Sequence, residues 1–226
     1  MQILFTKIRQ KNIDEVKRIL DKHPDAVNSA SGPKPKKDHG QSPLQVALKI
    51  GAIEIADYLL DHGADVNFME AEDDDPGVRM PVLFDAIIGA IASLCYKRYE
   101  ESDESVRIMK RMLDMGADTN RLHSYGSDAM QCAIFEANKI ISNPRIYADI
   151  QEETWKKLEM IMNLLMDYGF DYKAWMDRHL YPEPSPGPTC KEMYFDPIPS
   201  EMDLYVERWQ SMRDFIQNYF GKRNVR

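Results

Sequence analysis

The sequence predicts an all-α fold in which pairs of helices stack side by side as a solenoid. A short apolar motif recurs as LQVAL at 44–48, LFDAI at 83–87 and MQCAI at 130–134. A second motif follows each of them, as HGADVN at 62–67, MGADTN at 115–120 and, more weakly, YGFDYK at 168–173. Its glycines, Gly63, Gly116 and Gly169, are separated by 53 residues each time. Such self-similarity is typical of proteins whose units pack only on their neighbours.

The stretch from Ser42 to Asn67 shows how one unit is expected to fold. Ser42 caps the first helix, and Pro43 takes its first position, where a missing N–H has no cost. After Gly51 the chain reverses into a second helix with an apolar stripe. The stripe consists of Ile53, Ile55, Ala56, Leu59 and Leu60. Gly63 suits the left-handed conformation that ends many helices.

This stretch resembles the ankyrin repeat family, whose units open with T-P-L-H-x-A and end with G-A-D-V-N. The resemblance implies a helical solenoid with short hairpin-like turns, and it implies a function in binding other proteins. The family's Thr and His are replaced by Pro81 and Phe84 in the third unit and by Asp128 and Gln131 in the fourth. These replacements put the usual hydrogen bonds between turns in question there, although not the stacking of the helices.

Residues 4–28 repeat the same layout with an offset of 40, so Leu4 corresponds to Leu44. Lys7 stands where the family has a small Ala packed against the preceding unit. A first unit has no preceding neighbour, so a charge there is expected of a capping repeat. Residues 29–37 are rich in Ser, Pro and Lys and predict a long loop. Its basic tip, Lys34, Lys36 and Lys37, is expected to be solvated.

The third and fourth units are longer than the second. From the apolar motif to the helix-ending glycine the spans are 19, 33 and 39 residues, which places the insertions between the two helices of each unit. In the third unit, residues 87–99 prolong the inner helix and Asp103 caps the outer one. In the fourth, Asn143-Pro144 breaks the first helix and residues 150–166 form a long outer helix. The added surface is structural bulk, a dimer face or the binding site itself.

Beyond Tyr172 the repeat pattern ends. Prolines at every second position of 181–188 favour an extended, semi-rigid connector over an SH3 ligand. Ser200 with Asp203 opens a last amphipathic helix, and Gly221 closes it. Its apolar stripe is Met202, Tyr205, Val206, Trp209, Met212, Ile216 and Phe220. The simplest role for this helix is a cap on the end of the stack. The alternative is docking onto another protein through Tyr205, Trp209 and Phe220.

We therefore expect a single ankyrin-repeat domain over residues 1–226. Its repeats fall approximately at 1–28, 38–67, 78–120 and 123–172, and the Pro-rich segment and capping helix occupy 173–226. Hydrophobic residues make up 43% of the chain, which is enough for a continuous core.

The formal net charge of −8 disfavours nucleic acid as a partner, since phosphates require clustered Lys and Arg. Residues 1–37 hold nine Lys or Arg against four acids, whereas 38–76 hold Lys49 alone against ten acids. This polarity suits the steering of a charged partner.

The three cysteines form no C-x-x-C pair, which predicts reduced thiols and a cytoplasmic protein. The N-terminal segment is neither a secretory signal nor a membrane anchor by its pattern. No stretch approaches the roughly 20 apolar residues of a membrane helix, so we expect no membrane association. Export without a signal sequence stays compatible with the sequence.

Motifs for chemistry are sparse, and we predict no catalytic residue, metal or cofactor. The five histidines lack zinc-site spacing, and Cys132 lies in a buried-helix motif that predicts an inert thiol. The acidic run Glu70, Glu72 and 73–75 lacks the calcium-loop pattern, which favours a solvated loop over a cation site. The alternative function is an enzyme, or an enzyme's regulatory subunit, with a site near Trp155, Trp175 and the Pro-rich segment.

The resemblance also implies which residues bind a partner, because ankyrin proteins commonly use their hairpin tips and the exposed side of their inner helices. Matched by motif, these positions are Asp38, His39, Gln41, Lys49, Ile50, His62, Val78, Met80, Ser124, Tyr125, Ser127, Phe135 and Glu136. Ile88 falls in the same row, although the inserted segments provide an alternative in which Ile88 and Phe135 are covered.

The leading hypothesis is a monomeric adaptor that binds another protein through this concave face. A narrower version is an inhibitor or immunity-like protein that neutralises a basic partner. A third interpretation is a self-associating structural protein.

Overall fold

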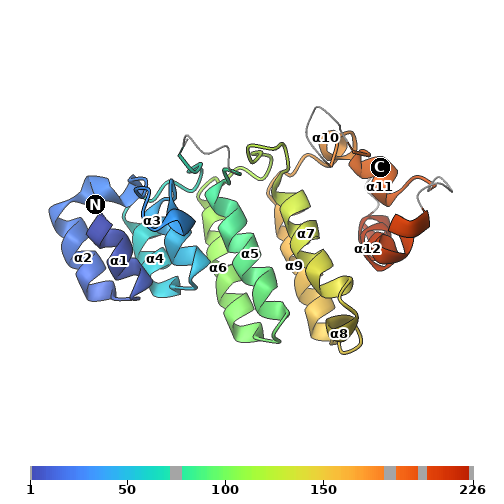
Figure 1. Ribbon diagram of the computed structural model, residues 1–226, viewed down its shortest axis with the longest axis horizontal. Coiled ribbons are helices and arrows are strands. Elements are labelled where there is room, and N and C mark those ends of the chain that lie inside the picture. The colour runs from blue at the N-terminus through green and yellow to red at the C-terminus, as the bar shows by residue number, and fades with distance from the viewer. Residues whose placement is uncertain (1, 72–77, 181–186, 198–202, 224–226) are drawn as a thin grey trace.

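The computed structural model describes residues 2–71, 78–180, 187–197 and 203–223. Pairs of helices follow one another along the long axis of the molecule (Figure 1). The inner row contains α1 (Gln2–Arg9), α3 (Pro43–Lys49), α5 (Val82–Leu94) and α7 (Ala129–Ile141). The outer row contains α2 (Ile13–Lys22), α4 (Ile53–Asp61), α6 (Tyr99–Asp114) and α9 (Glu152–Asp167). Within the described ranges the elements are helices and turns, which confirms the predicted all-α solenoid.

The second repeat folds as its sequence predicts. The Ser42 side chain accepts a hydrogen bond from the Gln45 N–H, and the Gln45 side chain accepts one from the Ser42 N–H, with Pro43 in the first helical turn. This reciprocal capping box satisfies two backbone donors that the start of a helix would otherwise leave free. The apolar stripe of α4 is buried except at Ile53, which is partly exposed, and Gly63 adopts a φ of +84° at the helix end.

Three asparagines join successive repeats at their turns, and we call Asn28, Asn67 and Asn120 the asparagine seam. Asn28 Nδ2 donates to the Gly63 carbonyl at 2.9 Å, and Asn28 Oδ1 accepts from the Asp65 N–H at 2.7 Å. Asn67 makes the same pair of bonds to Gly116 and Asp118, and Asn120 makes it to Gly169 and Asp171. At each of these junctions, an asparagine of one repeat bonds to the Gly and the Asp of the Gly-x-Asp turn in the next repeat.

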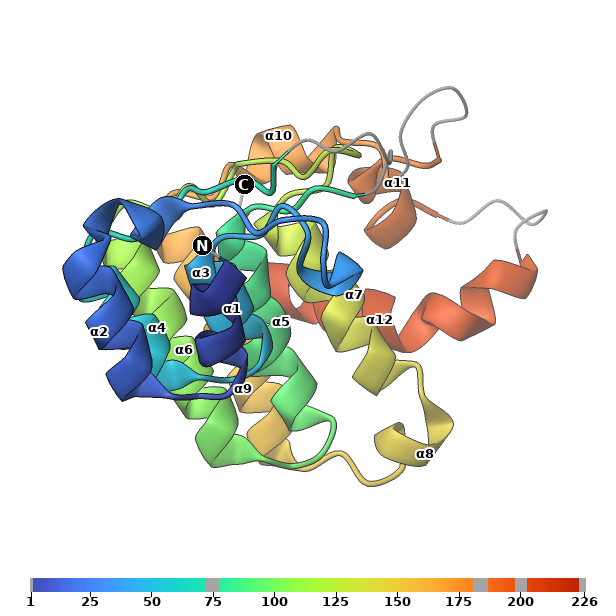
Figure 2. The same ribbon diagram turned by 60° about the vertical axis from the view of Figure 1, so that its left-hand side comes forward.

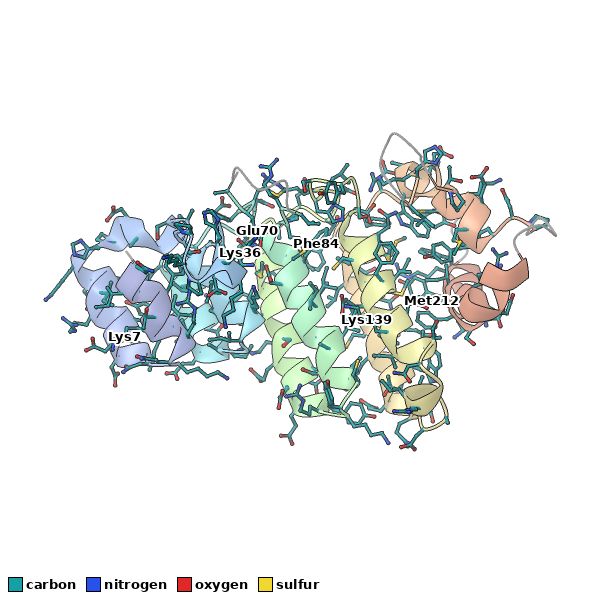
Figure 3. All side chains as sticks on the ribbon, viewed as in Figure 1. Lys7, Lys36, Glu70, Phe84, Lys139 and Met212 are labelled. Carbon is teal, nitrogen blue, oxygen red and sulfur yellow. The ribbon has the colours of Figure 1, made fainter. Side chains whose placement is uncertain are left out.

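The first repeat forms one end of the described stack. Leu4, Phe5 and Ile8 of α1 are buried against α3, while Lys7 lies on the outer side of α1 (Figure 3). A 3₁₀ turn, η1 (Pro24–Asn28), follows α2 at the end of the first repeat. The predicted loop over residues 29–37 comes after it and runs into a second 3₁₀ turn, η2 (Lys36–Asp38). Lys34, Lys36 and Lys37 are exposed at its tip, as expected.

The third and fourth repeats are enlarged by longer helices, as the spans predict. The helices α5 and α6 have 13 and 16 residues, whereas α3 and α4 have seven and nine. In detail two predictions are wrong. The inner helix of repeat three ends at Leu94 rather than Tyr99, because the chain reverses at Lys97, whose φ is +56°. Asp103 does not cap α6, which already begins at Tyr99; its carboxylate pairs instead with Lys157 of α9.

In the fourth repeat, Pro144 ends α7 as predicted and begins a short helix, α8 (Pro144–Tyr147). The outer helix α9 begins at Glu152, so Ile150 lies just before it.

The C-terminal segment contains α10 (Tyr172–Met176), α11 (Cys190–Tyr194) and α12 (Asp203–Lys222). Met212, Ile216 and Phe220 of α12 are buried, and Met212 faces the repeats (Figure 3). Because Phe220 packs on Tyr172 and Trp175, with ring centroids 4.5 and 5.5 Å apart, it is not available for docking elsewhere. Gly221 lies inside α12 instead of closing it. Ser200, most of the Pro-rich stretch and the side chains of Tyr205 and Trp209 fall outside the described residues.

Candidate binding face

Three loops, which join α2 to α3, α4 to α5 and α6 to α7, lie in a row along one edge of the stack. We call them the first, second and third loops, and together the loop row. The first loop bonds to the second through the Ala71 N–H and the Gly40 carbonyl, at 2.9 Å. The second bonds to the third through Arg79 and Ser124, whose backbone and side chain exchange two hydrogen bonds. An antiparallel bridge between Met69 and Pro81 closes the second loop as a hairpin. The loops are therefore positioned by backbone hydrogen bonds to one another.

Gly40 lies where the first loop approaches the second closely. Its φ is +75°, and a Cβ placed there would lie 2.9 Å from the Ala71 carbonyl oxygen. Both the backbone conformation and the contact exclude a side chain at this position.

Beneath the first two loops lies a network of buried polar side chains. Asp38, which is 2% exposed, pairs with Arg9 and lies 3.6 Å from Lys49 Nζ. Gln41 Nε2 donates to Glu70 Oε1 at 2.7 Å, and Glu70 Oε2 accepts from the Met80 N–H at 2.9 Å. Glu70 lies under the second loop, above the first turn of α5 (Figure 3). The network holds Met80 at a fixed place on the face, because buried polar groups keep their partners.

Asp85 continues this network on α5. Its carboxyl is buried and accepts a hydrogen bond from Gln45 Nε2 at 3.1 Å, with Glu70 and Lys49 as the charged groups around it. Burial, reinforced by the negative charge of Glu70, raises the pKa of Asp85 to about 7. The junction of repeats two and three therefore contains a carboxyl group that titrates near neutrality.

The third loop is organised around His123. The His123 Nδ1 accepts hydrogen bonds from the Tyr125 N–H at 3.0 Å and the Ser127 N–H at 3.3 Å. Burial lowers the pKa of His123, which favours the neutral ring that this acceptor role requires. The Tyr125 ring meets the His123 ring edge-on at a centroid distance of 6.2 Å, and the residue is 44% exposed.

The predicted binding residues fall into three groups by burial. Those with exposed side chains are Lys49, His62, Val78, Ser124 and Tyr125. Those partly exposed are His39, Ile50, Met80, Phe135 and Glu136. Asp38, Gln41 and Ser127 are buried and offer a partner little surface, because the hydrogen bonds of the loops enclose them. Ile88 is also partly exposed, so neither it nor Phe135 is fully covered by the inserted segments.

The structure also separates the predicted residues in space. Val78, Met80, Ser124 and Tyr125 belong to the loop row, with His39 at its first loop. His62 lies on the outer row, where its ring stacks on Tyr58 of α4 at a centroid distance of 3.9 Å. Lys49 and Ile50 stand at the end of α3 and line a cavity that the sequence did not predict.

That cavity, which we call the step cleft, has a volume of about 650 Å³. It forms where the short helices of repeat two end and the long helices of repeat three continue past them (Figures 1 and 2). Ile50, Gly51 and Ile53 line one wall, and residues of α5 and α6 line the other. The increase in motif-to-glycine span from 19 to 33 residues was the signal in the sequence that two helix pairs of unequal length meet here.

Helix capping differs between the enlarged repeats. Pro81 precedes α5 and provides no side-chain cap for it. In repeat four, the two residues that replace the family's Thr and His cap their own helix. Asp128 and Gln131 form a complete capping box, like Ser42 and Gln45. Asp128 also forms an ion pair with Arg178, which links this capping box to the C-terminal segment.

The features considered for an enzyme are mostly used in packing. Trp175 is fully buried, and Trp155 packs on Phe215 with ring centroids 5.2 Å apart. Desolvation raises the pKa values of the Cys95, Cys132 and Cys190 thiols, with Cys190 at about 12. Of the acidic run, Glu70 is buried in the loop network, and 72–75 fall outside the described residues. Among the described residues, no group of His, Cys, Asp and Glu is arranged to hold a metal ion.

A profile of the ankyrin repeat family matches residues 39–70, which include the second repeat and its following turn. No curated protein sequence matches the chain. In the described part of the chain, no helix has the length and apolar character needed to cross a membrane.

Proposed function

We propose that this protein, which contains an ankyrin repeat and folds as an ankyrin-type solenoid, is an adaptor whose loop row and adjoining concave side bind another protein. Ankyrin repeats are typically binding modules rather than catalytic ones. The repeat thus gives the general class of function, and the face and the partner are the subjects of the proposal.

One observation carries the choice of face. The loop row presents exposed or partly exposed apolar side chains, Val78, Met80 and Tyr125, on backbone held by hydrogen bonds between loops. Rigid aromatic and Met side chains are the usual anchors of protein interfaces. Because the backbone is already ordered, a partner would not need to order it on binding.

A narrower function is inhibition of a basic partner, in the manner of an immunity protein. The net charge of −8 supports it, since opposite charge accelerates association and favours basic surfaces. Binding to such a partner should weaken as salt rises, and binding that is insensitive to salt would contradict this narrower version.

We further propose a cytoplasmic, monomeric protein formed by one domain over residues 1–226. The three cysteines are free thiols, which supports a reducing compartment. Size-exclusion chromatography with light scattering tests the oligomeric state, and a stable dimer would favour self-association instead.

The face is tested by affinity capture with the double variant Met80→Ala/Tyr125→Ala, followed by mass spectrometry. The variant should lose at least about ten-fold of its affinity for the captured protein, since removing central anchors commonly costs that much. A matched control is Tyr96→Ala/Met160→Ala, which removes an exposed tyrosine and an exposed methionine far from the loop row. Equal loss in both double variants, or in neither, would rule out the proposed face.

A further inference from the structure

The step cleft lies outside the loop row and is built by a mismatch of helix lengths. Its first wall is the turn between α3 and α4, where the helices of repeat two end. Its second wall comes from lining residues of α5 and α6 between Gly89 and Ser105. Both helices continue beyond the helices of repeat two (Figure 1). In a solenoid of equal repeats, helices of the neighbouring unit would cover this wall.

The walls of the cleft differ in chemistry. On the repeat-two side, Leu48, Ile50 and Ile53 supply aliphatic surface. On the α5 side the lining residues are small, with Gly89, Ala92 and Ser93 in one helical row. Small side chains leave room for a long side chain to lie between the two walls.

The charged side chains at the rim of the cleft differ in whether they have an ion-pair or hydrogen-bond partner. Lys49 pairs with Asp38, Arg98 pairs with Glu101 at 2.8 Å, and Glu104 pairs with Arg107 at 2.9 Å. Lys11 donates to the Gly51 carbonyl at 3.2 Å, which holds its ammonium at the repeat-one end. Glu100 is different, because within the described residues its carboxylate has neither an ion-pair nor a hydrogen-bond partner.

The Ser105 hydroxyl is a second polar group on the same wall that can still form a hydrogen bond. Ser105 lies beside Gly89, and its hydroxyl has no hydrogen-bond partner among the residues that the structure describes. The cleft therefore combines aliphatic surface with one unpaired carboxylate and one free hydroxyl. An arginine side chain matches this combination, because its stem packs on apolar groups while its guanidinium forms paired hydrogen bonds with a carboxylate.

We infer that the step cleft binds an arginine side chain of a partner protein, with the stem against Ile50 and Ile53 and the guanidinium at Glu100. The inference deepens the proposed function, on which it rests, by naming one residue type that the partner presents. It also adds a contact site separate from the loop row.

Nuclear magnetic resonance titration of the purified ¹⁵N-labelled full chain tests this inference with synthetic peptides. The probe is acetyl-Gly-Leu-Arg-Leu-Gly-amide, and its control carries citrulline, which has nearly the same shape but no charge, in place of arginine. Amide shifts should concentrate at residues 50–53, 89–93 and 100–105. The arginine peptide should bind about three- to five-fold more tightly than the citrulline peptide, as expected for an exposed ion pair.

Two variants separate charge from shape. Glu100→Gln should reduce binding of the arginine peptide to the level of the citrulline peptide. Glu153→Gln, at the same second position of α9 and outside the cleft, should not. Ala92→Leu fills the cleft from α5 and should weaken both peptides by a similar factor.

Several outcomes would overturn the inference: shifts centred elsewhere, no binding of any peptide, tighter binding of a glutamate-centred peptide, or an unchanged Glu100→Gln variant. The titration requires only the purified chain, so its failure leaves the capture experiment on the loop row intact. Conversely, loss of the loop-row result with a positive titration would leave the step cleft as the binding site.

Discussion

Repeats one and two differ from repeats three and four in the length of their helices but not in how they are joined. The helices α3 and α4 have seven and nine residues, against 13 and 16 in α5 and α6. The asparagine seam nevertheless has the same hydrogen bonds at all three junctions. The added helical residues therefore extend a repeat away from the asparagine seam, and the hydrogen bonds that join the repeats are unchanged.

The same comparison shows where a repeat protein gains new surface. The extra turns of α5 and α6 are covered on one side by repeat four but project beyond repeat two on the other (Figure 1). The difference in length thus produces the step cleft, whereas a junction of equal repeats would not. In this protein, surface that equal repeats would not have arises where the short repeat two meets the long repeat three.

The largest effect is expected in the core of the extension. Ile91 lies in the added turns of α5 and is 1% exposed, while Ile55 of the short helix α4 is 2% exposed. If the added turns of α5 are part of the hydrophobic core, Ile91→Ala and Ile55→Ala should each lower the free energy of unfolding by about 2–5 kcal/mol. Chemical denaturation measures both. A cost for Ile91→Ala below about 1 kcal/mol would mean that the added turns are only appended to the stack.

The next effect concerns pH at the junction of the two halves. In the unfolded chain Asp85 loses its proton near pH 4, but in the folded chain it keeps the proton up to about pH 7. The folded state therefore binds more protons between these values, and the contribution of Asp85 to the free energy of unfolding falls as the pH rises from about 4 to 7. Asp85→Asn removes this loss and should be more stable than the parent at pH 8, by roughly 2–4 kcal/mol.

Asp57 provides a control of opposite sign on the outer side of the same junction. Hydrogen bonds and ion pairs from Arg107 and Arg111 lower the pKa of Asp57. Its contribution to stability is present above its unfolded pKa and is lost as the pH falls. Asp57→Asn should therefore be less stable than the parent at neutral pH. Denaturation from pH 4 to 8 checks both variants, and parallel pH profiles for Asp85→Asn and the parent would contradict the assignment.

Much of the fold could be predicted because its signals are local. Ser42 with Pro43 starts a helix through a cap, and Gly63 ends one through a left-handed turn, so the neighbouring residues suffice. Helix length in the enlarged repeats was also readable from motif spacing. The reversal at Lys97 was missed, because a lysine with positive φ carries no turn signature in the sequence.

The candidate site was less predictable, because it depends on contacts between distant residues. Alignment to the family placed Asp38 and Gln41 at the tips, but their burial follows from Arg9 in one direction and Glu70 in the other. Asp128 and Gln131 replace the family's Thr and His, yet they still form a capping box. The step cleft follows from the unequal lengths of two neighbouring helix pairs, which no single repeat contains.

The smallest expected effect tests whether the three asparagines of the seam contribute equally to stability, as their matching hydrogen-bond geometry predicts. Each side chain donates to a glycine carbonyl at 2.9 Å and accepts from an aspartate N–H at 2.7–2.8 Å. Replacing Asn28, Asn67 or Asn120 by Ala should lower the free energy of unfolding by about 1–2 kcal/mol in each case, since two partly exposed hydrogen bonds are lost. The three junctions join short to short, short to long and long to long repeats.

Equal costs at these junctions would show that helix length and repeat joining are independent. A markedly larger cost for Asn67→Ala, measured by urea denaturation, would instead mean that the short-to-long junction relies on its turn more than the others do. The variant Asn67→Asp separates the two bonds, because it keeps an acceptor for the Asp118 N–H while it removes the donor to the Gly116 carbonyl. If joining depends mainly on the donor, Asn67→Asp should be as destabilised as Asn67→Ala. If the acceptor contributes equally, Asn67→Asp should retain about half of the stability that Asn67→Ala loses.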